Sequence, residues 1–142
     1  MGKSSAYANS LLQLIFWGTA FDNLAQNAAA PLTNLYVALH TADPTVGGNQ
    51  SSSECNYNNY ARVAMTRNLT AWSISGNVVT PVNPIYFPVS VGITDQTATF
   101  FSVGEQASGP GTFLYSAPLV PTIRILANTT PILTAASQIT EA

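Results

Sequence analysis

The chain is 142 residues long, and 46% of its residues are hydrophobic while only 7% are charged. Its formal net charge is −2, and only four residues are basic, so no basic cluster is available to bind the phosphates of a nucleic acid. No apolar run reaches the roughly 18 residues that a membrane-spanning helix needs. The length suffices for one domain with its own core. We therefore expect a single domain that binds neither nucleic acid nor membrane.

The low charge is the most unusual property of this composition. Soluble domains carry about a quarter Asp, Glu, Lys and Arg, and these charges keep molecules apart in water. In this chain Ser, Thr, Asn and Gln supply most of the polarity instead. A surface of this kind is hydrated but repels its own copies only weakly. The composition therefore favours a subunit that packs against neighbours in an assembly.

The N-terminal region predicts one short helix. Its apolar face consists of residues spaced three and four apart, Leu11, Leu14 and Ile15, and is widened by Leu12 and Phe16. Gly18 suits the position just after the helix, and the candidate N-caps are Ser4, Ser5 and Asn9. Two interpretations stay open: this face docks on another protein together with Trp17, or it covers one end of the main domain. We assign residues 1–31 to the helix and an arm, and residues 32–142 to the main domain.

From residue 32 onward, short strands alternate with turns. Runs rich in β-branched and aromatic residues recur at near-regular spacing, separated by Gly, Pro, Asn and Asp. The expected strands cover residues 35–40, 61–67, 72–79 with a turn at 75–77, 85–87, 89–93, 98–103, 113–115, 123–126 and 132–134. Prolines at 81, 84 and 88 predict that the strand at 85–87 is an edge or is cut short. This pattern is typical of a mainly β fold, here an antiparallel, jelly-roll-like β-sandwich.

A long polar segment, residues 43–59, separates the first two expected strands. Its content of Gly, Ser and Asn predicts a loop, and loops of this length are commonly functional or flexible. Cys55 has polar neighbours, so we expect a loop thiol rather than a core one, with no reactive or metal-binding role. Tyr57 and Tyr60 lie at the end of the segment and are candidates for a protein contact.

We find no set of residues in the sequence that would carry catalysis. His40 is the only histidine, and we interpret it as a cap for a turn at a strand end rather than as a base or metal ligand. The six acidic residues are thinly spread, and no phosphate-binding loop or nucleophile motif occurs. We therefore predict no catalytic residue, no cofactor and no metal site.

Aromatic rings are the remaining candidates for binding a small ligand. Tyr57, Tyr60 or Trp72 could stack on a sugar, because an aromatic ring with a polar tip suits a carbohydrate. In the alternative interpretation, Trp72 fills the core and the two tyrosines anchor a protein interface. The pattern favours the core and interface interpretation over the sugar site.

Residues 35–44, which read Leu-Tyr-Val-Ala-Leu-His-Thr-Ala-Asp-Pro, resemble a motif of small virion proteins of tailed bacteriophages. In those proteins the motif is followed by a Gly/Ser-rich loop and a Tyr-Ala-Arg element, which is residues 60–62 in this chain. Similar segments follow in the same order at residues 85–88, 91–95 and 111–119. The predicted helix ending near residues 16–20 also fits. The resemblance implies a small, β-rich structural protein that works by contact.

The resemblance leads to three functional hypotheses. The first is a capsid cement or decoration protein, assembled in the bacterial cytoplasm, that binds across subunits of the major capsid protein on the capsid exterior and stabilises the expanded shell. Many modest contacts add up over such a symmetric shell. The second is a tail or tail-fibre-associated protein, and the third is a carbohydrate-binding receptor module. We expect a homo-oligomer, a dimer or trimer, whose protein-interface candidates are Leu11, Leu14, Ile15, Trp17, Tyr57 and Tyr60.

Overall fold

In a computed structural model of the chain, residues 5–20 and 32–142 are described. Helix α1 (Ser5–Leu12) continues into a π-helical turn, η1 (Gln13–Trp17). Gly18 follows with a left-handed backbone, φ 68°, which glycine adopts readily because it has no Cβ. The predicted helix end at Gly18 is therefore confirmed. Among the candidate N-caps, Ser5 is the first helical residue, Asn9 lies inside the helix, and Ser4 lies outside the described residues.

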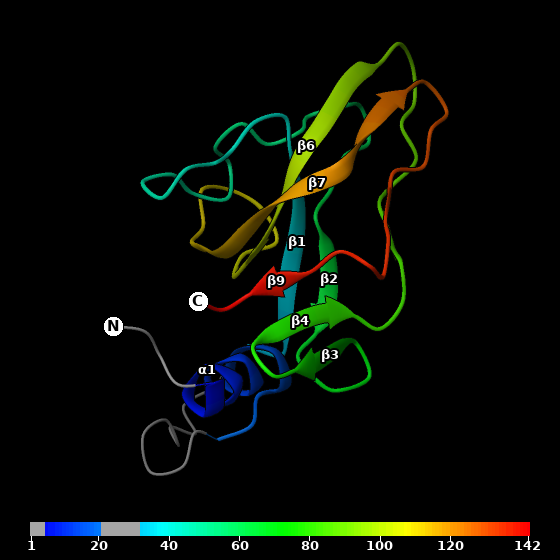
Figure 1. Cartoon of the computed structure of the whole chain (residues 1–142). Coiled ribbons are helices and arrows are strands. Elements are labelled where there is room, and N and C mark those ends of the chain that lie inside the picture. The colour runs from blue at the N-terminus through cyan, green and yellow to red at the C-terminus, as the bar shows by residue number, and fades with distance from the viewer. Residues whose placement is uncertain (1–4, 21–31) are drawn as a thin grey trace.

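The largest sheet has four antiparallel strands in the order β2–β1–β6–β7 (Figure 1). These strands are β1 (Asn34–His40), β2 (Val63–Thr66), β6 (Asp95–Gly104) and β7 (Phe113–Leu126). The last four residues of β1, which lies between β2 and β6, are all buried. A strand covered on both faces has a continuous apolar run rather than an alternating one. This explains why Val37, Ala38 and Leu39 follow one another without a polar residue.

Two smaller sheets complete the described β-structure. Strands β3 (Trp72–Ser75), β4 (Val78–Pro81) and β9 (Ile139–Thr140) form one sheet, and β5 (Ile85–Tyr86) pairs with β8 (Ile132–Leu133). All of these pairings are antiparallel. The prediction of a mainly β, antiparallel fold with a short N-terminal helix is therefore confirmed. Strand β5 is as short as its flanking prolines predict.

One apolar core joins the sheets to the N-terminal helix. Val37 of the four-stranded sheet shares a buried cluster with Trp72 and Val79 of the three-stranded sheet. Leu12 and Phe16 enter the same cluster and are fully buried. The rings of Phe16 and Trp72 meet edge-on, with centroids 4.6 Å apart. The helix therefore lies beside β3 and covers one end of the packed sheets (Figure 1).

Two strand predictions differ from the structure in how far the strands extend. Residues 113–115 and 123–126 belong to a single strand, β7, because both parts pair with β6 on either side of a bulge near Thr99. Strand β9 was not predicted, since a two-residue strand is too short to show a period. Residues 21–31, assigned to an arm after the helix, lie outside the described residues. The domain boundary at residue 31 therefore stays a prediction.

The predicted strand at residues 89–93 is wrong. Ser90 is buried; its backbone N–H donates to Thr129 O at 2.9 Å, and its carbonyl accepts from the Asn128 N–H at 3.0 Å. The backbone here is thus bound to a turn and not to a neighbouring strand. Gly92 has a φ of 71°, which an extended strand does not allow. Local turn chemistry overrides the β-branched alternation of this segment.

Candidate functional site

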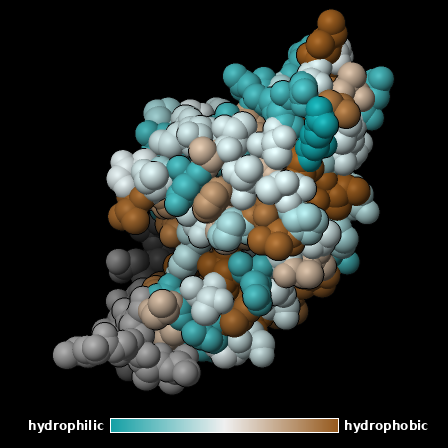
Figure 2. Space-filling model, turned by 45° about the horizontal axis from the view of Figure 1, so that its top comes forward, coloured by the Kyte–Doolittle hydropathy of each residue, from teal (hydrophilic) through white to brown (hydrophobic). Residues whose placement is uncertain are grey.

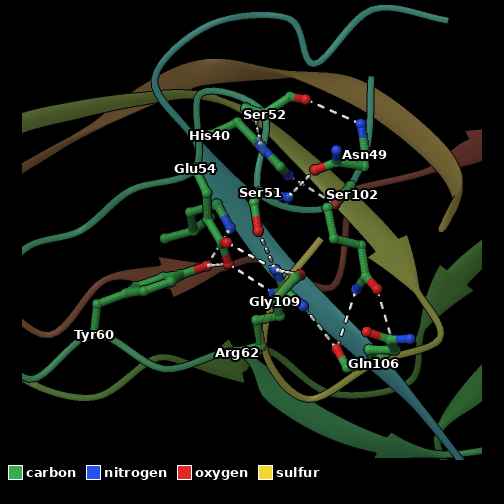
Figure 3. A network of polar contacts seen from close by, with 12 residues as sticks. His40, Asn49, Ser51, Ser52, Glu54, Tyr60, Arg62, Ser102, Gln106 and Gly109 are labelled. Carbon is green, nitrogen blue, oxygen red and sulfur yellow. Dashed lines mark hydrogen bonds and ion pairs between the residues drawn. The ribbon is translucent and has the colours of Figure 1, made fainter. Parts of the chain in front are cut away.

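Loop 41–62, the segment that joins β1 to β2, is held by one largely buried ion pair (Figure 3). Arg62 Nε donates to Glu54 Oε1 at 2.7 Å, and Arg62 Nη2 donates to Glu54 Oε2 at 2.8 Å. The side chain of Arg62 is 2% exposed and that of Glu54 is 15% exposed. A charge with so little access to water needs an opposite charge and further hydrogen bonds. This requirement explains why two of the few charged residues of the chain lie together.

Arg62 also ties loop 41–62 to the β6–β7 loop, residues 105–112. Its Nη1 donates to Gln106 O at 2.9 Å, and its Nη2 donates to Gly109 O at 2.7 Å. The Tyr60 hydroxyl donates to Glu54 Oε1 at 2.8 Å. Burial, followed by the charge of Glu54, raises the pKa of Tyr60, so this hydroxyl keeps its proton. The Tyr-Ala-Arg element thus fixes two loops against each other.

Gln50 completes the contact between these two loops. It is fully buried, its side-chain carbonyl accepts from the Gln106 backbone N–H at 3.0 Å, and its side-chain amide donates to Gln106 O at 3.2 Å. A Cβ at Gly104 would lie 2.2 Å from Gln50 Cδ, and a Cβ at Gly111 would lie 2.3 Å from Gln50 Oε1. Both positions therefore need glycine for the loops to approach this closely.

His40, the last residue of β1, lies near Arg62 and Glu54, and we call these residues and their hydrogen-bond partners the polar cluster (Figure 3). Its Nδ1 lies 2.8 Å from Ser52 O, and its Nε2 lies 2.7 Å from Ser102 Oγ. A carbonyl oxygen only accepts, so Nδ1 carries a proton, and in the neutral ring Nε2 then accepts from the Ser102 hydroxyl. Burial lowers the pKa of His40, which favours this neutral form. His40 therefore caps the turn at residues 50–53, as the sequence predicts.

The prediction of a loop thiol at Cys55 is wrong. Cys55 is 2% exposed and belongs to the apolar core cluster. Its backbone N–H donates to Leu39 O at 2.8 Å, because loop 41–62 returns along the end of β1. Burial, followed by the charge of Glu54, raises the pKa of this thiol to about 12. The polar sequence around Cys55 gives no sign of this burial, and the next residue, Asn56, is exposed.

The three aromatic residues considered for sugar stacking are mostly covered. Tyr57 is 4% exposed and Trp72 is 2% exposed, so neither presents a ring face to a ligand. The core position predicted for Trp72 is confirmed. Tyr60 is half-buried, and its ring meets that of Tyr57 edge-on with centroids 5.3 Å apart. The sugar-stacking hypothesis does not fit this burial, while a protein contact at Tyr57 and Tyr60 stays a prediction.

The helix residues chosen as interface candidates are all half-buried: Leu11, Leu14, Ile15 and Trp17. The fully buried positions are Leu12 and Phe16, so the residues that widen the predicted apolar face lie deeper in the core than Leu11, Leu14 and Ile15 at its centre. Ile15 and Trp17 pack against the core from its edge. The helix thus serves as a cover for the β-domain, and its use as a docking surface stays a prediction.

Hydrogen bonds fasten this helix to the strands. Arg67, which follows β2, donates from Nη2 to Leu14 O at 2.5 Å and from Nε to Ile15 O. Trp17 Nε1 donates to Trp72 O at 2.9 Å. The last carbonyls of a helix have no partner within it, so a cation placed there satisfies them. The helix is therefore part of the folded domain.

A groove that the sequence did not indicate lies along β7. We call it the β7 groove; residues 117–123 line one side and residues 132–140 contribute the other. Its larger part has a volume of about 440 Å³, and an adjoining part has about 90 Å³. The described residues that line it include no charged side chain, and Val120 at its rim is 91% exposed. Because two distant segments form the groove, no local pattern could reveal it.

Within residues 5–20 and 32–142, which the structure describes, no group of three or more His, Cys, Asp or Glu side chains is arranged to hold a metal ion. No helix of the same residues is long and apolar enough to cross a membrane. What these residues do provide is two loops fixed by hydrogen bonds from the buried side chains of Arg62 and Gln50, and a groove without charged lining residues. Both features suit binding through surface contact.

Comparison with known families gives a match over nearly the whole chain. A family model described as "Podophage GP4 fiber I protein gp80" matches residues 2–140. No curated protein matches the chain. The matched range includes all the described strands, the polar cluster around Arg62 and the β7 groove.

Proposed function

We propose that this chain, which belongs to the family of the podophage GP4 fiber I protein gp80 and is a bacteriophage virion structural protein, is a subunit of a tail fibre. The family match carries the proposal, because its description names a fibre protein. That description favours the tail alternative over the capsid cement hypothesis and its partner, the major capsid protein. The protein would then lie on the tail and not on the capsid exterior.

The organisation of the polar cluster supports a role in a fixed assembly. The buried side chains of Arg62 and Gln50 tie loop 41–62 to Gln106 of the β6–β7 loop, and Glu54 holds Arg62 in place. A surface that is already ordered loses less conformational entropy when it binds a neighbour. Preorganised loops and a low charge both favour stable packing between virion subunits.

We further propose that the protein acts by contact and not by catalysis. The side chains best suited to act as a base or nucleophile, those of His40, Cys55 and Glu54, already have partners within the fold or are buried. Both ring nitrogens of His40 have hydrogen-bond partners, and the Cys55 thiol is buried with a pKa raised to about 12. Glu54 is paired with Arg62. A general base or nucleophile needs a free, accessible lone pair near its substrate, and these residues lack one.

Immunogold electron microscopy of purified virions tests the tail assignment. Antibodies raised against the purified protein should place gold at the tail and leave the head bare. The same serum, first absorbed with an excess of the purified protein, is the control and should give no gold. Gold distributed over the head surface would overturn the proposal in favour of the capsid cement hypothesis.

A further inference from the structure

We propose that the core of the domain binds one water molecule, which accepts a hydrogen bond from the Trp72 indole N–H and donates one to the Ser137 hydroxyl. Both residues line a small cavity whose walls come from the four-stranded and the three-stranded sheets. The inference goes beyond the fibre assignment and does not depend on it, since it concerns the interior of a single copy. It assigns a ligand to a part of the molecule that the proposed function leaves unused.

The Trp72 indole N–H is a buried donor that lacks an acceptor. The residue is 2% exposed, and its Nε1 has no hydrogen-bond partner among the described residues. Trp17 differs in this respect, because its Nε1 donates to Trp72 O at 2.9 Å. The hydrophilic residues on the face shown in Figure 2 meet solvent water, but Trp72 in the core has no such access. Nearly all buried donors in proteins bind another protein group or an ordered water, so Trp72 needs a partner of this kind.

The size of the cavity selects water as its occupant. Its volume is about 10 Å³, at the lower end of the roughly 10–15 Å³ that one water molecule requires. Val37, Val79 and Leu133 are among the buried residues that form its walls. No larger ligand fits in such a space, and an apolar one would leave the indole N–H without an acceptor. The volume and the unpaired donor therefore point to the same ligand.

Ser137 provides the second polar partner that a buried water needs. Among the described residues that line the cavity, only Trp72 and Ser137 have polar side-chain atoms. A cavity with a wholly apolar lining stays dry, whereas a water held by two or more polar groups is retained. Ser137 also lines both parts of the β7 groove, so this half-buried residue borders the cavity and the solvent-accessible groove. Water therefore has a route from solvent to the site.

Nuclear magnetic resonance of the full, isotope-labelled chain tests the site directly. The chain has two tryptophans, so its spectrum has two indole N–H signals, and the variant Trp17→Phe identifies the one from Trp72. A bound water should give a cross-peak to the Trp72 indole proton with opposite signs in the laboratory-frame and rotating-frame experiments, which distinguishes it from proton exchange with solvent. Absence of this cross-peak would overturn the inference. If the indole proton is instead shifted upfield, the N–H donates to the ring of Phe16, whose centroid lies 4.6 Å from that of Trp72.

Filling the cavity provides a second test. Val79→Ile adds one methyl group to a buried residue of the cavity wall, so it should displace the water and remove the cross-peak. The matched control is Val46→Ile, which should keep the cross-peak because Val46 is fully exposed and lies outside the cavity. Circular dichroism should show that both variants are folded. A cross-peak that persists in Val79→Ile would come from the Ser137 hydroxyl and would overturn the inference, and no outcome bears on the gold labelling of the tail.

Discussion

Glu54 and Arg62 form a two-point ion pair across loop 41–62, with 2.7 Å between Arg62 Nε and Glu54 Oε1. The pair is largely excluded from water, and Arg62 extends it to two carbonyls of the β6–β7 loop. The Tyr-Ala-Arg element, residues 60–62, thus has a structural role in this fold. Arg62 holds the two loops in one arrangement, and His40 joins the turn at residues 50–53 to Ser102 of β6.

Substitution Arg62→Met should destabilise the fold strongly. It leaves the Glu54 carboxylate largely buried without a counter-charge, a change that typically costs about 3–5 kcal/mol of unfolding free energy. Urea denaturation measures the loss. The matched control is Arg124→Met, which breaks an ion pair with Asp95 whose side chains are both more than half exposed, and should change stability little. Similar losses in the two variants would contradict the account of the buried pair.

Substitution Gly104→Ala should also destabilise the protein. The added Cβ would meet the buried Gln50 side chain at 2.2 Å, and overpacking of this kind costs roughly 1–3 kcal/mol. Gly47→Ala is the control, because no atom lies within 4 Å of a Cβ built there. Adding Gln50→Ala to the Gly104 variant should remove the steric part of the loss. Thermal unfolding of the four proteins gives the comparison, and equal midpoints for the two single glycine variants would refute the close approach.

The stability of the protein should fall on mild acidification because of His40. Burial lowers the pKa of His40 in the folded state, whereas an unfolded histidine titrates near pH ~6.5. Below that pH the His40 imidazole is protonated in the unfolded chain but not in the folded chain. The contribution of neutral His40 to the free energy of unfolding is therefore complete above pH ~6.5 and is lost as the pH falls toward the lowered pKa of the folded state. Urea denaturation between pH ~5 and ~8 should show this decline.

The variant His40→Gln provides the control for this pH dependence. His40 is the only histidine of the chain, so its removal should flatten the unfolding free energy across the same pH window, although the variant is less stable throughout. A decline of equal slope in the variant would assign the effect to other groups.

The helix should behave as part of the core. Phe16→Ala removes a fully buried ring and should cost about 3–5 kcal/mol of unfolding free energy. Leu11→Ala removes a half-buried side chain of the predicted stripe and should cost much less. Guanidinium denaturation distinguishes the two variants. Comparable losses would contradict the account, because Leu11 would then anchor the helix as strongly as Phe16.

The sequence predicts those features that depend on neighbouring residues. Strand β1 shows a β-rich run that ends at turn residues, and Gly18 has the freedom that a helix end requires. Both signals lie within a few residues of the structure they predict, so they need no knowledge of the fold. The segment 89–93 shows where this reasoning fails, because its alternation is β-like while the bonds of Ser90 draw it into a turn.

Features of the candidate site depend on residues that are distant in the chain. Cys55 is buried because loop 41–62 returns to Leu39, and nothing in the polar stretch around Cys55 records that return. The β7 groove exists only where residues 117–123 meet residues 132–140. Such sites become visible only when the fold brings the two segments together.

The number of copies per virion tests the tail-fibre assignment most directly. Mass spectrometry with isotope-labelled peptide standards gives the amount of this chain relative to the major capsid protein in purified virions. A tail fibre follows the low-order symmetry of the tail, so the account predicts roughly a few tens of copies or fewer. A count in the hundreds, close to that of the capsid subunits, would contradict the assignment and place the protein on the shell.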